Sequence, residues 1–251
     1  MLPGHDNFKW IAADWPVPGH VYAGSTTRCG GISQPPYDSL NLAAHVGDKD
    51  KNVFQNRQRL INELQLPAEP AWLEQQHGCE IIDAAATDKE KRRADGAYTS
   101  ITGHVCVVLT ADCLPLLICD RDGDEIAAIH IGWRGYTKNI ITAAIKTFRQ
   151  RPENLLAWIG PCISAGHYEV GKEVRQACIS VSETSAIAFT PSRKDHWYAD
   201  IQLLVRLQLQ EYGLENVFGG QYCTYEDKSL FYSYRRDRDT GRTASMIWMD
   251  S

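Results

Sequence analysis

Three polar side chains interrupt a long apolar stretch at positions 103–135, GHVCVVLTADCLPLLICDRDGDEIAAIHIGWRG. Asp112 and Cys113 stand between two strand-like runs, and His130 stands near the end of a third. A cysteine beside a histidine has two uses. The imidazole can lower the pKa of the thiol and create a nucleophile, or both side chains can bind Zn²⁺ or copper. Either use requires the fold to bring Cys113 and His130 together.

The Asp122-Gly123 pair predicts a tight hairpin turn between the runs Leu114–Cys119 and Glu125–Ile131. Pairing these runs places Cys113 opposite residues 130–132, where facing Cβ atoms lie about 5 Å apart. Cysteine and histidine then lie at the end of the hairpin away from the turn, where strands open into loops and sites are usually built. Taken alone, a cysteine and a histidine in apolar runs are more often core residues.

A third metal ligand is available in the segment Gln75-Gln76-His77-Gly78. His77 follows an apolar run, and Gly78 gives the backbone beside it more freedom. Asp112 and Asp95 supply carboxylates that can orient a histidine, bind a hydroxyl group or cap a turn.

Three arginines lie in polar or turn-like segments, Arg28 in STTRCGG, Arg134 in GWRG and Arg235 after an aromatic run. Arginine prefers planar or anionic partners such as phosphate and carboxylate. Each of these arginines can instead form an ion pair with one of the 31 acidic side chains.

The surrounding chain predicts short strands and helices without regular alternation. Strand-like runs occur at Val21–Thr26, Ala71–Glu74, Val105–Thr110, Leu114–Cys119, Glu125–Ile131, Leu156–Gly160, Gly219–Cys223, Phe231–Tyr234 and Ala244–Trp248. Helical patterns occur at Asp50–Leu64, Asn139–Arg149, Gly171–Cys178 and Asp200–Tyr212, the last with Asp200 as N-cap and Gly213 as the C′ residue. The mixture predicts an α+β fold with mixed, largely antiparallel sheets. The glycine-rich nucleotide loops GxGxxG and GxxxxGK[ST] are absent.

Size and charge exclude several classes of protein. The 251 residues are evenly patterned, without repeats or linkers, which predicts a single domain over positions 1–251. A formal net charge of −5 argues against nonspecific binding to nucleic acid or to anionic membranes. No apolar stretch is long enough to span a bilayer, and the N-terminus does not resemble a signal peptide, so we expect a cytoplasmic protein. The eight scattered cysteines form no CxxC pair and no expected disulfide framework.

A series of motifs resembles one known family over nearly the whole chain. In order they are STTRCGG (25–31), YDSLNL (37–42), HVGD (45–48), NR (56–57), QHG (76–78), ADG (94–96), TADCLP (110–115), HIGWRG (130–135), IGPCI (159–163), YEVG (168–171), FYSYRRD (231–237) and TGR (240–242). The chain resembles the laccase-domain, or "multicopper polyphenol oxidase", family, whose bacterial members are described as purine nucleoside phosphorylases.

The resemblance implies a single-domain layered α/β sandwich, likened in fold to bacterial toxin deamidases with a Cys–His site. It also implies a metal site made of His77, Cys113 and His130 that holds Zn²⁺ or a single copper ion. Two departures from the family pattern are small, because Ile131 replaces a common alanine and Gln75 precedes Gln76 where a Gln-Val-His run is expected. Neither departure removes a ligand.

The "multicopper" description is not matched by the histidine content. Four-copper oxidases use about ten histidines, largely as HxH pairs. This chain has only eight histidines, and no two of them are two positions apart: His5, His20, His45, His77, His104, His130, His167 and His196. A four-copper cluster is therefore not expected.

The first functional hypothesis is a purine nucleoside enzyme, acting on nucleoside and phosphate. It would convert adenosine, inosine and methylthioadenosine with phosphate to the base and sugar 1-phosphate, with zinc-dependent deamination of adenosine as a further activity. Asp112 is the candidate acid/base partner. The candidates for holding phosphate or stacking the base are Arg28, Arg134, Arg235, Trp133 and Tyr234.

Two alternatives remain open. In a Cys–His amidohydrolase that edits a seryl-muramoyl nucleotide precursor of peptidoglycan, Cys113 is the nucleophile, His130 its base, and His77 or Asp112 an orienting group. In a non-enzymatic binding module the metal is a structural staple, and Cys162 supplies the fourth ligand that structural zinc requires. The oligomeric state is not predicted.

Overall fold

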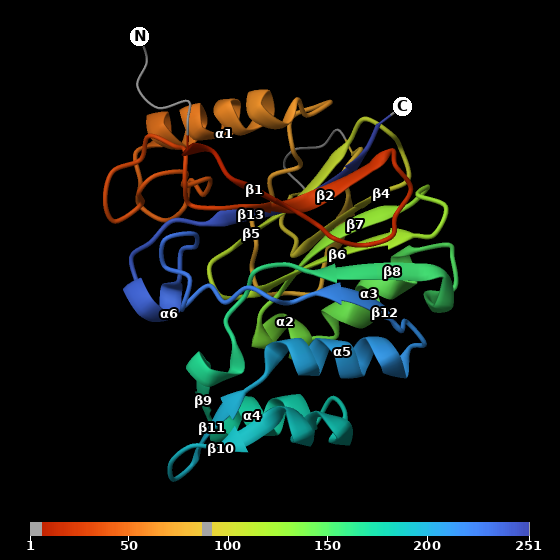
Figure 1. Cartoon of the computed structure of the whole chain (residues 1–251). Helices are drawn as coiled ribbons and strands as arrows, with labels where there is room; N and C mark the ends of the chain where they lie inside the picture. The colour runs from red at the N-terminus through yellow and green to blue at the C-terminus, as the bar shows by residue number, and fades with distance from the viewer. Residues whose placement is uncertain (1–6, 87–91, 251) are drawn as a thin grey trace.

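Two β-sheets stacked face to face form the centre of the molecule, and helices cover their outer faces (Figure 1). The computed structural model describes residues 7–86 and 92–250. The arrangement confirms the predicted α+β sandwich with mixed, largely antiparallel sheets. Among the described residues, no helix combines the length and apolarity needed to cross a membrane.

The larger sheet carries most of the site. Across the sheet its strands are β12 (Asn216–Gly219), β8 (Leu155–Ile159), β6 (Leu114–Asp120), β7 (Ile126–Ile131), β4 (Gly96–Thr99) and β3 (Ile81–Asp83). The β12–β8 and β3–β4 pairs are parallel, and the other pairs are antiparallel. Every residue of β6 and β7 is buried, because one face meets the smaller sheet and the other meets helices.

The smaller sheet packs on one face of the larger sheet. Its strands are β1 (Trp10–Ala12), β2 (Val21–Thr26), β13 (Thr243–Met249) and β5 (Val105–Thr110), all antiparallel. A separate antiparallel sheet of three short strands lies at the far end of the molecule (Figure 1): β10 (Phe189–Pro191), β11 (His196–Ala199) and β9 (Glu169–Gly171).

Helices close the two outer faces. The α-helices are α1 (Asp50–Leu64), α2 (Trp133–Thr137), α3 (Ile140–Thr147), α4 (Lys172–Ile179), α5 (Ile201–Glu211) and α6 (Tyr234–Asp237), and the short 3₁₀ helices are η3 (Pro152–Asn154), η4 (Ala165–His167) and η5 (Glu183–Ala188). Helix α1 packs Leu60 against the smaller sheet. Helices α2 to α5 pack against the larger sheet and one another. Three apolar layers of side chains therefore hold the sandwich together.

Most predicted elements are confirmed, with ends shifted by one or two residues. Helix α1 and strands β2 and β5 have the predicted bounds. The end signals of α5 are also confirmed: the Asp200 carboxylate accepts a hydrogen bond from the Leu203 N–H at 2.9 Å, and Gly213 has a φ of +86°.

Three strand predictions are wrong, each for a local reason. The run 219–223 fails because Gly219 and Gly220 have φ of +74° and +92°, which ends the strand at Gly219. The run 231–234 fails because Ser233 caps α6, although the aromatic side chains before it are buried. The run 71–74 forms no strand. The Ala71 N–H bonds to the Val105 carbonyl of β5, and the Gln75 side chain, just beyond the run, bonds to the β5 backbone at Leu109, but no ladder forms.

Candidate active site

The structure brings together the three side chains that the sequence singled out as metal ligands. One nitrogen from each of His77 and His130 and the sulfur of Cys113 all lie within 4.8 Å of one another. The Cys113 sulfur lies 3.8 Å from His77 Nε2, and the two imidazole rings meet edge to face with centroids 4.7 Å apart.

The hairpin sets the position of Cys113 relative to His130. In the β6–β7 ladder Leu114 pairs with Ile131 and Pro115 with His130, so Cys113 lies opposite Gly132. The predicted register is thereby confirmed. A Cβ atom on Gly132 would lie 2.9 Å from His77 Cδ2 and 3.1 Å from the Cys113 sulfur. Only glycine at this position leaves both ligands where they are.

Asp95, just before β4, organises both histidines. It lies beside β7, where its backbone carbonyl accepts a hydrogen bond from the His130 N–H at 2.7 Å. Its carboxylate accepts a hydrogen bond from His130 Nδ1 at 2.8 Å and the backbone N–H groups of Gln76, His77 and Gly78 at 3.1, 2.9 and 2.6 Å. One buried side chain therefore fixes the His130 ring and shapes the loop that carries His77, whose φ is +55°.

The charges in this cluster support one another. Burial alone would raise the pKa of Asp95, but hydrogen bonds from His130 and Gly78 lower it to about 2. Burial also disfavours the imidazolium, yet Cys113 and Asp95 raise the pKa of His130 to about 9. Against the cost of burial, His130 and His77 lower the pKa of the Cys113 thiol to about 6. At neutral pH the metal-free site thus holds a thiolate beside an imidazolium.

The donor set fits a borderline-soft metal ion. Because His130 Nδ1 is held by Asp95, its Nε2 is the nitrogen free to bind, which is the carboxylate–histidine–metal pattern of many metal sites. Two imidazoles and one thiolate suit Zn²⁺ or copper and leave a fourth position open. Within residues 7–86 and 92–250 no other such group of His, Cys, Asp and Glu occurs. Cys162 does not join it: its buried sulfur accepts a hydrogen bond from Gln202 Nε2 at 3.4 Å.

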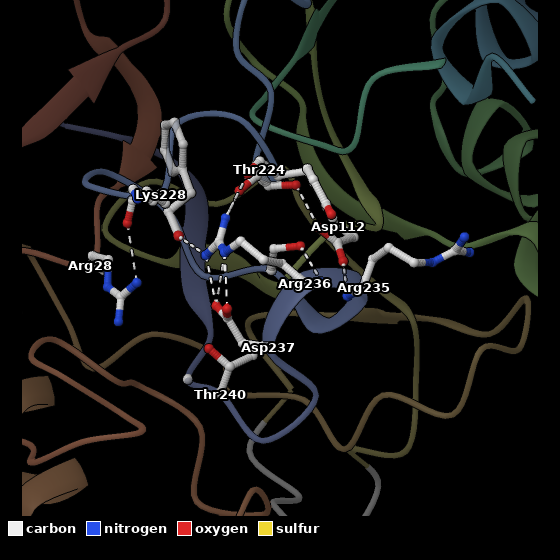
Figure 2. A network of polar contacts seen from close by, with 12 residues as sticks. Arg28, Asp112, Thr224, Lys228, Arg235, Arg236, Asp237 and Thr240 are labelled. Carbon is white, nitrogen blue, oxygen red and sulfur yellow. Dashed lines mark hydrogen bonds and ion pairs between the residues drawn. The ribbon is translucent and has the colours of Figure 1, made fainter. Parts of the chain in front are cut away.

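Asp112, adjacent to Cys113, has a different set of partners. Its two carboxylate oxygens accept hydrogen bonds from the Thr224 hydroxyl and the Arg235 N–H, both at 2.6 Å (Figure 2). The orienting role for His130 therefore belongs to Asp95 rather than Asp112. With a φ of +93°, Asp112 turns the chain sharply between β5 and Cys113.

Arg236 holds the segment that Asp112 touches. Its guanidinium donates hydrogen bonds to the backbone carbonyls of Thr224, Tyr225 and Phe231 and pairs with the Asp237 carboxylate at 2.7 Å (Figure 2). This network ties the loop before α6 to α6 itself. Together, Asp112 and Arg236 keep the backbone of Arg235 beside Cys113.

The predicted arginines divide between two places. Arg28 pairs with Asp38 at 3.2 Å, donates to the Lys228 carbonyl at 3.1 Å and lines a separate open cavity of about 780 Å³, so the structure does not bring it to the cysteine–histidine cluster. Arg134 and Arg235 do reach the cluster. Arg134 stacks on Trp133 at 4.4 Å, and Arg235 lies over Tyr168 at 5.2 Å.

Two neighbouring pockets, here called lobes, adjoin the cluster, and both are lined by His77, Ala111, Cys113, Arg134 and Tyr234. The "aromatic lobe" has a volume of about 230 Å³ and is also lined by Trp133, Ile163, Tyr168, Ile201, Arg235 and Arg238. The "His45 lobe" has a volume of about 320 Å³ and is also lined by His45, Gln75, Leu109, Thr110, His130 and Arg242. The shared residues form a waist between the lobes.

Sequence reasoning missed several of these lining residues as site residues, including Tyr168 in the aromatic lobe and two that meet in the His45 lobe, His45 and Arg242. Both stand in family motifs, HVGD and TGR, but they are separated by almost the whole chain. Nothing local to either motif indicates that they meet. Burial, followed by the charges of Arg242 and Arg57, lowers the pKa of His45, so His45 lies in a positive electrostatic environment.

Comparisons with known proteins place the chain in a family. It is 47% identical over 241 residues to "Purine nucleoside phosphorylase YfiH" of Escherichia coli, covering 96% of this chain and 99% of that protein. It is 43% identical over 241 residues to "Purine nucleoside phosphorylase PA4543" of Pseudomonas aeruginosa, covering 96% of this chain and 98% of that protein.

Solved structures share the fold. The crystal structure of the Neisseria meningitidis protein NMB0706 superposes with a TM-score of 0.93 at 40% identity, over 96% of this chain and 99% of that chain. YlmD of Geobacillus stearothermophilus superposes with a TM-score of 0.90 at 28% identity, over 96% of each chain. A family model described as "Multi-copper polyphenol oxidoreductase laccase" matches residues 22–250. The chain therefore belongs to the multi-copper polyphenol oxidoreductase laccase family.

Proposed function

We propose that this protein is a purine nucleoside phosphorylase, which converts adenosine, inosine or methylthioadenosine and phosphate to the free base and sugar 1-phosphate. The relatives that match nearly the whole chain at 43–47% identity carry this name. The observation that carries the proposal is the cavity, because aromatic and cationic walls meet at the one cysteine–histidine cluster found among the described residues.

The residues of the chain divide the work of binding. In the aromatic lobe, Trp133 and Tyr168 offer flat faces for a purine. Arg134 stands at the waist, within reach of an anion in either lobe. When bound, a Zn²⁺ or single copper ion held by His77, Cys113 and His130 would supply Lewis-acid chemistry at the waist.

A second activity that we propose for the same site is adenosine deamination. Three protein ligands with an open fourth position are typical of catalytic rather than structural zinc. Deamination also needs an acid/base group, and Asp112 remains a prediction for that role. Because both Asp112 oxygens already accept hydrogen bonds, one of these contacts would have to exchange during turnover.

The amidohydrolase alternative is favoured by one observation. In the metal-free protein, Cys113, His130 and Asp95 form a nucleophile, a base and an orienting carboxylate, with a thiol pKa of about 6. Such a site suits attack on an amide of the seryl-muramoyl nucleotide. The metal-stapled binding module has no comparable support, because Cys162 lies outside the ligand group.

The test pairs metal analysis with product analysis. The purified protein is assayed with adenosine plus phosphate and, separately, with the seryl-muramoyl nucleotide, before and after chelation and after thiol alkylation of the metal-free form. We expect phosphate-dependent release of adenine, and its loss in Cys113→Ala. Full adenosine activity in that variant would mean that a contaminant produces the adenine. Amide cleavage that survives chelation but not alkylation would favour the amidohydrolase.

A further inference from the structure

The two lobes of the cavity offer an anion different surroundings. In the aromatic lobe, the guanidinium of Arg235 donates from Nη1 to the Glu169 carbonyl at 2.7 Å and lies over Tyr168. In the His45 lobe, Arg242 lies over Tyr234 at 5.9 Å. Its Nη1 donates to the backbone carbonyls of Thr240 and Gly241 at 2.8 and 2.9 Å, which fixes the side chain.

Arg242 is a half-buried cation that feels the negative charges of Cys113 and Asp112 from a distance. Among the residues that the structure describes, no carboxylate forms an ion pair with Arg242, and no hydrogen bond engages its Nε or Nη2. Burial lowers its pKa from the usual value, which is the direction expected of a cation that has lost water. A fixed guanidinium with free donors is prepared to hold an oxyanion through paired hydrogen bonds.

The neighbours of Arg242 extend this anion-binding character. His45 lines the same lobe, and its imidazole feels the positive charges of Arg242 and Arg57. Arg134 adds a further cation at the waist. Both lobes are therefore lined by arginines, but in the His45 lobe Arg242 stands beside His45, whereas in the aromatic lobe Arg235 stands beside the rings of Trp133 and Tyr168.

The geometry of phosphorolysis requires this kind of division. A phosphate oxygen forms a bond to C1′ of the ribose while the C1′–N9 bond breaks, and the electron pair of that bond leaves with N9 of the purine, which is then protonated. The incoming phosphate and the departing base lie on opposite sides of C1′. Two neighbouring lobes on either side of the cluster suit this order of base, ribose and phosphate.

We propose that the His45 lobe is the phosphate subsite, with Arg242 as its principal anchor and His45 as a second donor, and that the aromatic lobe receives the purine. This assignment rests on the proposed phosphorylase function. It specifies which lobe binds which substrate. It also assigns phosphate binding to Arg242, which lies outside the motifs TADC and HIGWRG.

The test compares arginines from the two lobes in the metal-loaded protein. Arg242→Gln is expected to raise the KM for phosphate by roughly 10- to 100-fold, because charge-assisted hydrogen bonds are lost. The same change is expected to raise the KM for inosine far less. Arg242→Lys keeps the charge without the fork and is expected to fall between Arg242→Gln and the unmodified protein. Arg235→Gln is expected to reverse the pattern, with the larger rise in the KM for inosine.

Arg121→Gln is the matched control, since Arg121 lies exposed at the hairpin turn far from the cavity. A direct readout accompanies the kinetics: inorganic phosphate is titrated into each variant, without nucleoside, and binding is followed by calorimetry. Phosphate binding by the unmodified protein and by Arg121→Gln, together with weakened binding by Arg242→Gln, would support the subsite.

The outcomes separate this inference from the proposed function. Phosphorolysis with an unchanged phosphate KM in Arg242→Gln would overturn the subsite and leave the phosphorylase intact. No phosphorolysis by the unmodified protein would overturn the function. In that case, loss of calorimetric phosphate binding in Arg242→Gln would still support an anion site in the His45 lobe, and undiminished binding would overturn it.

Discussion

Two buried aspartates flank the cluster, and their partners differ. Asp95 holds the His130 ring and the three N–H groups of the loop around His77, so it acts on the metal ligands. Asp112 holds Thr224 and the start of α6, so it acts on the wall of the aromatic lobe. The same residue type thus organises the cysteine–histidine cluster on one side and the wall of the aromatic lobe on the other. Asp112 is next to Cys113 in the sequence, yet it is Asp95 that contacts the two histidine-bearing segments.

The largest effect is expected from Asp95→Asn. The introduced amide keeps only one acceptor oxygen, so its NH2 group would face either the N–H groups of Gln76 and Gly78 or the Nδ1 of His130. We expect metal affinity to fall by about 10- to 100-fold and the free energy of unfolding to fall by about 3 kcal/mol. Metal content after dialysis and denaturant unfolding measure the two effects. Metal retention at the unmodified level would remove the distinction between the two aspartates.

Gly132→Ala tests the reactive centre by sterics alone. The new methyl group would press on His77 and Cys113, while Gly132 itself has an ordinary extended backbone. We expect weaker metal binding, by about tenfold, and destabilisation of about 1–2 kcal/mol. Gly19→Ala is the matched control, because no atom lies within 4 Å of its Cβ position. Equal behaviour of the two variants would show that close packing at position 132 is unimportant.

Asp112→Asn tests the substrate wall. Only one oxygen remains to serve Thr224 and the Arg235 N–H, so α6 should shift relative to Cys113. We expect about a tenfold rise in the KM for nucleoside with metal content unchanged. Thr224→Val, which removes one of the two contacts, should show a smaller rise. Metal loss in Asp112→Asn would place this residue with Asp95 and contradict the division of roles.

The last prediction concerns pH and sharpens the role of Asp95. Its pKa falls from 3.8 to about 2 on folding, so the unfolded chain binds protons first as the pH drops. The corresponding stability is present above pH 4 and is lost as the pH falls through 2. We expect the metal-free protein to lose about 2 kcal/mol more than Asp95→Asn over this window, measured by urea unfolding. Equal losses of unfolding free energy in the two proteins between pH 4 and 2 would contradict the lowered pKa of Asp95.

The sequence predicted those parts of the site that depend on local pattern. The Asp122-Gly123 turn and its two apolar runs define a hairpin, and the hairpin sets Cys113 against residues 130–132. His77 was identified through a family resemblance and a neighbouring glycine. The turn and the glycine are signals that lie close to the site residues in the sequence. Once the position of a hairpin turn is identified, the pairing of all residues in its two strands follows.

The remainder depends on contacts between distant strands. Asp95 reaches His130 only because β4 pairs with β7, and the short β4 carries no strong strand pattern. Arg242 reaches the cavity only because β13 pairs with β5, where Thr243 faces Thr110. Conversely, the aromatic run before α6 looks like a strand because its side chains are buried, although its backbone bends.

The cavity lies at the seam of the sandwich. Cys113 and His130 belong to the hairpin of the larger sheet, while Arg242 immediately precedes an inner strand of the smaller sheet. With phosphate on Arg242 and the sugar against the cluster, one set of ligands would connect the two sheets, which pack on each other through a layer of apolar side chains. Saturation with both substrates should then slow sliding of the layers and protect amides far from the cavity against deuterium exchange.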